Sequence, residues 1–207
     1  MKKLSVLIIL LAIFGFNVQA QSNAQSILDK STAKIKSSKG ISLSFSLTQK
    51  DKLNHIVSSS KGTMKIKGSK FYIKQGSNEI FCNGTQIWNY DGEKEVTVTK
   101  ADNADDAFSP QQIVTGFNKN DYDIKLVSSA GTNYQLQLTP VDKRKNFKHI
   151  MLYINKSTSL LTKASVTDKT NAITEVSFSN ISLNVSLADS LFVFDAAKHG
   201  GVEIINE

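Results

Sequence analysis

The sequence predicts a mainly β fold with two helices, and three observations lead to this prediction. From Ile41 onward, apolar and polar residues alternate through much of the chain, which is the period of a strand with one buried face. Asn83-Gly84 and Asp91-Gly92 each stand between β-rich runs, and such dipeptides are strong signals of a hairpin turn. Only two stretches, residues 26–36 and the residues after Ser109, carry apolar side chains at helical spacing. The 207 residues, 40% hydrophobic and 21% charged, fit a single globular domain.

Residues 1–20 are predicted to be a secretory signal peptide. Lys2 and Lys3 form a positive n-region, residues 4–16 form an apolar run, and the sequence before Ala20 suits a cleavage site. The apolar run is short for a membrane span, so an uncleaved N-terminal anchor is the weaker alternative. No cysteine follows Ala20, so we expect no lipid anchor there. The expected mature protein is a soluble, exported chain in which residues 21–207 form one domain.

The elements are expected in a definite order along the chain. Residues 26–36 predict an amphipathic helix, with Ile27, Leu28 and Ile35 apolar and the lysines elsewhere on the wheel. Residues 41–48 open the sheet, because apolar residues alternate there with serine and threonine. Further strands are predicted around residues 63–67 and 70–74, as a three-strand meander within 79–100, and at 122–127, 134–139, 148–155, 161–168 and 174–181.

A second helix is predicted after Ser109-Pro110, because serine caps helix starts and proline suits the first helical position. Ile113, Val114 and Phe117 would share one face of this helix. The preceding acidic residues Asp102, Asp105 and Asp106 could be a metal or acid–base cluster, but no ligand partners follow at metal-binding spacing. We therefore interpret them as solvated acids beside a helix start.

No known catalytic constellation is present in the sequence, so we expect a protein that is not an enzyme and needs no cofactor or metal. The lone Cys82 is expected to be a small buried hydrophobe rather than a reactive thiol. The formal net charge of +7 includes a basic turn at residues 143–145. We interpret this turn as a solvated hairpin tip, with contact to a membrane surface or a partner as the lesser possibility. An export signal argues against nucleic acid as a partner.

One face of the predicted sheet is strongly apolar and must be buried. The sheet could close into a barrel, pair with a second sheet or curl around helices, and the sequence does not separate a packed interior from a hollow one. Counting by alternation assigns to this face Leu43, Phe45, Leu47, Met64, Ile66, Phe71, Ile73, Trp88, Tyr90, Val96 and Val98.

The order of several short motifs resembles the LolA family of periplasmic lipoprotein carriers. The match runs through a strand at residues 45–50, a glycine-led strand at 62–67 and a turn with a W-x-Y strand at 83–91. It continues with Val96-Thr97-Val98, the helix opening at Pro110, residues 191–194 and the tail at 201–205. Each piece is a common strand pattern, and the order and spacing together carry the resemblance.

The resemblance implies an unclosed antiparallel β-barrel, a strongly curved sheet capped by an α-helical lid. It implies a periplasmic carrier whose apolar cavity shelters lipoprotein acyl chains, with the eleven residues above as the cavity and Ile113, Val114 and Phe117 as the lid. The partners would be acylated lipoproteins, an inner-membrane exporter and an outer-membrane acceptor, and we expect a monomer. In the family an Arg-Pro pair helps to set lid closure and cargo transfer, and the matching stretch here, Lys67-Gly68-Ser69-Lys70, has neither residue. The alternative is a LolA-like domain that senses lipids, lipoproteins or envelope stress without transport.

Overall fold

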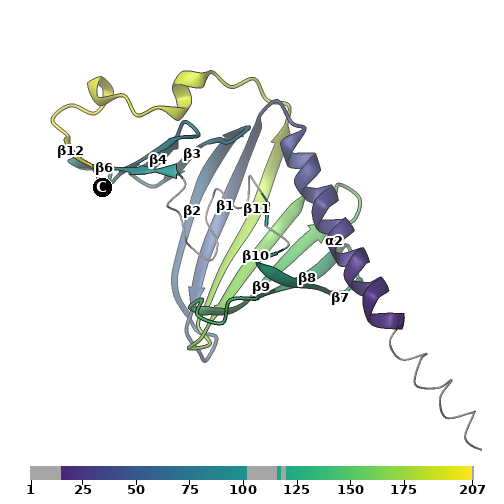
Figure 1. Ribbon diagram of the computed structural model, residues 1–207. Helices are drawn as coiled ribbons and strands as arrows, with labels where there is room; N and C mark the ends of the chain where they lie inside the picture. Colours follow the sequence, from purple (N-terminus) through teal and green to yellow (C-terminus); the bar gives the residue numbers. More distant parts are fainter. Residues whose placement is uncertain (1–14, 102–115, 118–119, 207) are drawn as a thin grey trace, which may run out of the picture.

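A computed structural model of the chain describes residues 15–101, 116–117 and 120–206, with side chains from Asn23 onward. Within these residues one sheet holds twelve strands in the order β12-β6-β5-β4-β3-β2-β1-β11-β10-β9-β8-β7. The sheet is strongly curved, and helix α2 runs beside its concave side (Figure 1). The edge strands β12 and β7 do not pair with each other, so the barrel is unclosed. The predicted fold class, a curved antiparallel sheet capped by a helix, is confirmed.

The bounds of the elements follow the chain. They are α2 Gly15–Lys36, β1 Ile41–Lys50, β2 Ile56–Lys67, β3 Lys70–Gln75, β4 Asn78–Cys82, β5 Gln86–Tyr90, β6 Glu95–Lys100, β7 Tyr122–Ser128, β8 Asn133–Pro140, β9 Phe147–Asn155, β10 Leu161–Asp168, β11 Ile173–Leu183, the 3₁₀ turns η2 Asp189–Phe192 and η3 Ala196–Lys198, and β12 Glu203–Asn206.

The strands predicted from alternation are confirmed, including the meander of β4, β5 and β6 around its two glycine turns. Both turn glycines have positive φ, +99° at Gly84 and +88° at Gly92, which residues with a side chain rarely adopt. Helix α2 is longer than predicted: it begins at Gly15 rather than at residue 26. The predicted lid residues Ile113 and Val114 lie outside the described residues.

The chain after β11 crosses back over the sheet and ends in a strand. Residues 191–194 fall at η2 and just beyond it, and β12 then pairs with β6 in parallel, whereas the other strand pairs are antiparallel. We use the name C-terminal segment for residues 187–206, which carry η2, η3 and β12. In Figure 1 this segment is the yellow stretch that runs from the end of the helix to β6.

Two apolar clusters lie on opposite faces of the sheet. Between β4 and β5, Cys82 is opposite Ile87 and Phe81 is opposite Trp88, so neighbouring residues along each strand belong to different faces. Cys82 and Ile87 belong to the concave cluster, and Phe81 and Trp88 belong to the cluster on the other face.

The prediction that Trp88, Tyr90, Val96 and Val98 share the concave face is therefore wrong, because all four belong to the cluster on the other face. The error has a physical cause. A strand's side-chain period is two, so choosing the wrong parity moves its whole apolar set to the opposite face. In β5 the large aromatic residues alternate with Ile87, which is the residue that packs on the concave core.

Candidate functional site

The concave face is covered by one stripe of helix α2. Ala24, Leu28 and Ser31 are buried and Ile35 packs on the same cluster. These residues recur at spacings of three and four, which places them on one side of a helix. Few side chains of α2 therefore pack on the sheet, and these are either small or aliphatic.

The predicted cavity residues of the first three strands do meet. Leu43, Phe45, Met64, Ile66, Phe71 and Ile73 are buried in one cluster, and Leu47 packs against it half-buried. The other half of this cluster was missed: Leu136, Leu138, Ile150, Leu152, Ile154, Val176 and Phe178 come from β8, β9 and β11. The same alternation is present in those strands, so extending the parity count to them would have found these residues.

Two small apolar pockets lie between α2 and the sheet. One, of about 20 Å³, is bounded by Ile35 of α2 and by Leu43 and Phe178 of the sheet, among others. The other, also about 20 Å³, lies where Leu28 faces Leu152. Each has room for about one water molecule, whereas a cavity of about 150 Å³ is needed to hold a ligand as small as benzene. The described side chains therefore fill most of this interface, and an acyl chain could enter only if α2 moved.

A wider cavity lies farther along the same helix. Its volume is about 190 Å³, and it is lined by Ile27 and Lys30 of α2 and by Tyr134, Ile154 and Lys156, with two serines. Ile154 also lines the second small pocket, so the two spaces adjoin. The apolar interface thus opens toward a more polar space at one side of α2.

Phe117, the only predicted lid residue that the structure describes, lies outside any helix but close to this interface. It packs against the concave cluster, and its ring meets that of Tyr122 edge-on, with centroids 5.8 Å apart. Its neighbour Gly116 lies against α2, because a Cβ built there would be 2.7 Å from the methyl carbon of Thr32. Residues 116–117 therefore contact both the helix and the sheet.

Gly62 makes room for a ring in the concave face. It is the cross-strand neighbour of Phe45, and a Cβ built on it would be 2.5 Å from the Phe45 ring and 2.4 Å from the carbonyl oxygen of Lys74. A glycine in a strand interior often marks such a close approach. The glycine of the resemblance motif is therefore required by the packing of Phe45.

Cys82 is fully buried in the concave cluster, as predicted for a small hydrophobe. Burial raises the pKa of its thiol, and the amide of Gly84 donates a hydrogen bond of 3.4 Å to the sulfur. A neutral buried thiol is a poor nucleophile. Over the part of the chain that the structure describes, no three His, Cys, Asp or Glu side chains gather as a metal site would require, and no helix is long and apolar enough to cross a bilayer.

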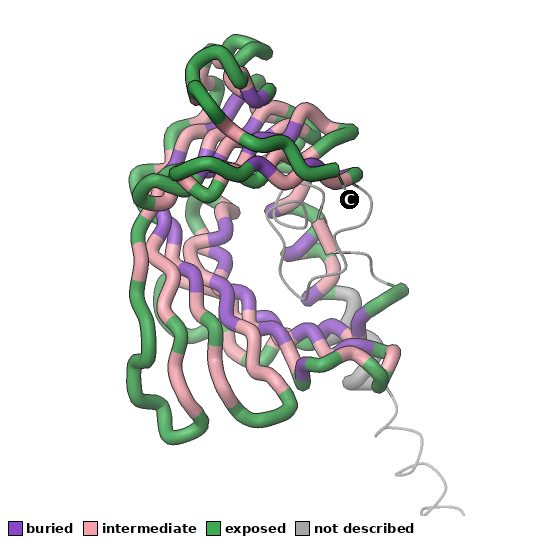
Figure 2. The backbone as a smooth tube through the Cα atoms, turned by 90° about the vertical axis from the view of Figure 1, so that its left-hand side faces the viewer, coloured by how far each residue is buried: buried purple, intermediate pink, exposed green. Residues whose placement is uncertain are grey.

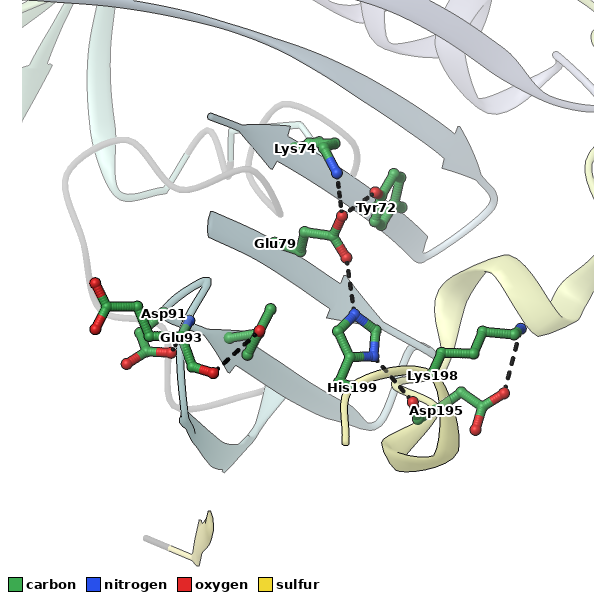
Figure 3. Close-up of polar contacts among 9 residues, drawn as sticks. Tyr72, Lys74, Glu79, Asp91, Glu93, Asp195, Lys198 and His199 are labelled. Atoms are coloured by element: carbon green, nitrogen blue, oxygen red, sulfur yellow. Dashed lines mark hydrogen bonds and ion pairs between the residues drawn. The ribbon is translucent and has the colours of Figure 1, made fainter. Parts of the chain in front are cut away.

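The other face of the sheet carries a polar network beneath the C-terminal segment (Figure 3). Glu79 on β4 accepts hydrogen bonds from Lys74 Nζ at 2.6 Å and from the Tyr72 hydroxyl at 3.0 Å, and its second oxygen lies 3.4 Å from His199 Nε2. Burial favours the protonated acid, but the bonds from Lys74 and Tyr72 outweigh it and lower the pKa of Glu79. Burial and the Glu79 carboxylate raise the pKa of Tyr72 to about 12.

Aromatic rings surround this network. The His199 ring lies 4.6 Å from the Phe194 centroid and 4.8 Å from that of Tyr90. Tyr72 and Phe81 are 5.0 Å apart. The C-terminal segment thus covers the aromatic rings of this face and also contacts Glu79 through His199.

The stretch that stands where the family has its Arg-Pro pair holds the same segment in place. Lys67 and Lys70, on either side of the β2–β3 turn, both reach Asp189 Oδ1, at 2.9 and 3.0 Å. Lys67 Nζ also donates to the carbonyl oxygen of Leu187 at 2.9 Å. These bonds lower the pKa of Asp189. The two lysines therefore hold the start of the C-terminal segment to the sheet.

Comparisons with known proteins agree with this architecture. Residues 36–195 match the model of the family described as outer membrane lipoprotein carrier protein LolA. The chain is 26% identical over 213 aligned positions to an outer-membrane lipoprotein carrier protein of Francisella tularensis, covering 100% of this chain and 98% of that one. It is 28% identical over 170 positions to a protein of the same name from Nitrosomonas europaea, covering 79% and 81%.

Among solved structures, an uncharacterized conserved protein from Thermus thermophilus aligns with a TM-score of 0.60 at 12% identity, covering 89% of this chain and 99% of that one. This likeness shows the shared fold. The family match spans more than half of the chain and includes β1 through η2. The chain belongs to the LolA family of outer membrane lipoprotein carrier proteins.

Proposed function

We propose that the protein is a soluble periplasmic carrier that shelters the acyl chains of lipoproteins between α2 and the concave face of its sheet. It would receive acylated lipoproteins from an inner-membrane exporter and deliver them to an outer-membrane acceptor, acting as a monomer and without catalysis. The proposal keeps the signal peptide at residues 1–20 with cleavage after Ala20. Family membership and the names of the relatives support this role.

The observation that carries the proposal is the apolar interface under α2. The two pockets there are lined by aliphatic and aromatic side chains with few polar neighbours, and the helix stripe that covers them is narrow. Apolar contacts are non-directional, so a lipid chain can replace the helix stripe on the sheet. This exchange would suit cargo recognised by its acyl chains rather than by its sequence.

The energies of this exchange are compatible with a reversible carrier. Moving one long acyl chain from water into an apolar site gains about 10 kcal/mol of free energy, at about 0.8 kcal/mol per methylene. The helix stripe offers Ala24, Leu28 and Ile35, and fully burying a leucine or isoleucine is worth about 1.5–3 kcal/mol. Relative to a chain in water, the gain from one bound chain therefore exceeds the loss of the helix contacts, so a bound chain can keep α2 displaced. Transfer from a membrane, where the chain is already buried, gains little free energy, and this allows the cargo to be released again.

A reversible crosslink tests whether α2 must move. A Cβ at position 116 would lie 3.5 Å from the Cβ of Thr32, at the lower limit of the separations found in disulfides. We expect oxidised Thr32→Cys/Gly116→Cys, in a Cys82→Ala background, to take up a fluorescent fatty acid at least about tenfold less than the reduced form. The strain of a side chain at Gly116, where φ is +86°, is present in both forms, so each sample is its own control.

The crosslink should also block transfer. Release of a lipoprotein from inner-membrane vesicles should occur with the reduced protein and stop with the oxidised one. The two single-cysteine variants should respond to neither oxidant nor reductant. Equal uptake of the probe by the two redox forms, with the disulfide verified by mass, would show that cargo does not enter under α2. Solvent extraction of the purified wild type, which should yield co-purified lipid or lipoprotein, provides an independent check.

A further inference from the structure

Three hairpins turn at the same end of the sheet. We use the name hairpin rim for residues 50–57, 140–148 and 168–172, at the β1–β2, β8–β9 and β10–β11 turns. Lys50 pairs with Ile173, which brings the first and third turns together. The amide of Lys169 donates to the carbonyl oxygen of Asn146 at 3.2 Å, which joins the third turn to the second. Figure 1 shows the three turns grouped at the lower end of the long strands.

Exposed aliphatic side chains are concentrated on this rim. Leu53, Ile56 and Val57 are 67%, 66% and 64% exposed, and Val141 is 59% exposed. These four are half of the eight large hydrophobic residues that are exposed in the described part of the chain. Single exposed hydrophobic residues are normal on a protein surface, but a group of them commonly marks a contact site.

The first turn holds its apolar residues in a defined position. The Asp51 carboxylate accepts hydrogen bonds of 2.9 Å from the amides of Leu53 and His55. Asn54 has a φ of +68°, a conformation that asparagine tolerates better than most residues. A turn built in this way projects Leu53 and Ile56 from the end of the sheet.

The rim is also positively charged. Its carboxylates, Asp51, Asp142 and Asp168, accept hydrogen bonds from the amides of their own turns, and the neighbouring Asp121 lies beside Val141. Even with Asp121 counted, seven cations exceed these four carboxylates. The cations are Lys50, Lys52, Lys143, Arg144, Lys145, Lys148 and Lys169.

We propose that the hairpin rim binds the surface of an anionic lipid bilayer, with Leu53, Ile56 and Val57 entering the headgroup layer and the surrounding lysines pairing with lipid phosphates. Apolar residues that enter the interface, combined with cations that attract anionic lipid, are the two contributions that give peripheral membrane binding. Leucine and valine are under-represented among the residues that dominate protein–protein binding, whereas leucine is typical of segments that bind a membrane interface. The exposed apolar residues of the rim are all aliphatic.

The proposal goes beyond the carrier function, because the rim shares no residue with the pockets under α2. It would hold the protein at a membrane surface by one end of the sheet, while Ile41 and Leu183, which line a pocket under α2, pair at the other end of β1 and β11. A carrier that failed to bind acyl chains could still bind vesicles through the rim, and the reverse also holds.

Vesicle flotation tests the proposal with the exported protein recovered from the periplasmic fraction. We expect binding to vesicles of equal phosphatidylcholine and phosphatidylglycerol, and much weaker binding to phosphatidylcholine alone. Raising the salt concentration should weaken the binding, because charges at the surface are screened. Lys52→Gln/Lys143→Gln should lower the partition coefficient about 25-fold, from about fivefold for each lysine. Leu53→Ser/Ile56→Ser should lower it about tenfold or more.

Matched controls use residues outside the rim. Lys34→Gln/Lys94→Gln removes two exposed lysines, and Val127→Ser removes an exposed valine of β7. These variants should bind anionic vesicles like the wild type, and all variants should keep their far-UV circular dichroism and their uptake of a fatty-acid probe. Equal binding to both vesicle types, or rim variants that bind like the wild type, would overturn the proposal. It would also be overturned if polyglutamate bound the rim as tightly as the anionic vesicles did and Leu53→Ser/Ile56→Ser left vesicle binding unchanged, since this result indicates an acidic protein partner.

Discussion

The two faces of the sheet are covered in different ways. On the concave face, α2 contributes a narrow apolar stripe that lies against a large apolar cluster. On the other face, the C-terminal segment is held by the bonds of Asp189 to Lys67 and Lys70, by the contact of His199 with Glu79 and by the pairing of β12 with β6. Figure 2 shows buried positions recurring along the strands between intermediate and exposed ones, and the concave cluster holds most of the buried hydrophobic residues in the described part of the chain.

From this difference we infer which of the two covers a ligand would replace. Apolar contacts have no fixed geometry, so an acyl chain can take the place of α2 with little loss. Hydrogen-bonded ion pairs and strand pairing require particular partner atoms, which a lipid chain does not offer. We therefore expect cargo on the concave face, while the C-terminal segment stays in place.

The largest effect should come from removing one aromatic ring on each face. Phe45→Ala should lower the free energy of unfolding by about 3–5 kcal/mol and weaken binding of an acyl probe, because Phe45 lies in the concave cluster. Trp88→Ala should cost less, since Trp88 is only half-buried, and should leave probe binding unchanged. Urea unfolding and probe titration on folded samples measure both quantities. Loss of probe binding in the Trp88 variant alone would reverse the assignment of the two faces.

A smaller effect is expected when a methyl group is added to the concave face. Gly62→Ala should lower the free energy of unfolding by about 1–3 kcal/mol, because its Cβ would overlap the Phe45 ring and the Lys74 carbonyl oxygen. Gly200→Ala is the control, because its Cβ would meet no atom within 4 Å and its backbone is not in the left-handed region. The double variant Gly62→Ala/Phe45→Ala should recover part of the loss, since the ring is then absent. If Gly62→Ala were as stable as the wild type, the Phe45 ring would not be fixed against β2.

The smallest effect should appear on the other face in acid. The pKa values of Glu79 and Asp189 are lowered in the folded protein, so the stability that these groups contribute is present above their ordinary pKa values. This contribution is lost as the pH falls through the lowered values, below about pH 4. We expect the C-terminal segment to loosen there before the sheet unfolds. Trp88, the one tryptophan of the chain, lies in the cluster beneath the segment and reports on it by fluorescence.

A glutamine at position 79 separates the acid effect from general unfolding. Glu79→Gln keeps the oxygen that accepts from Tyr72 but removes the charge that pairs with Lys74. The variant should show a smaller fluorescence change between pH 5 and pH 3, a range that brackets the ordinary carboxylate pKa values. A fluorescence change that coincides with loss of far-UV circular dichroism in both proteins would mean that the segment does not loosen separately.

The strands could be predicted from the sequence because their signals are local. Alternation in β1 and the Asn83-Gly84 and Asp91-Gly92 turns depend on neighbouring residues, and the structure confirms them. Half of the concave cluster could be predicted in the same way from Leu43, Met64 and Phe71. The resemblance to the LolA family depended on the order of these local motifs, and the family match confirms it.

The sequence by itself thus determined the strands, the turns, the burial of Cys82 and the family, because backbone period and turn chemistry are read over a few residues. The tertiary structure alone decided on which face of the sheet Trp88 lies. The face of each residue in β5 depends on which residue of β4 it pairs with across the turn. The tertiary structure also decided that Lys67 and Lys70 meet Asp189, more than a hundred residues later in the chain, and that Gly62 accommodates Phe45. Nothing in the sequence around either partner predicts these contacts, so only the folded structure brings the residues together.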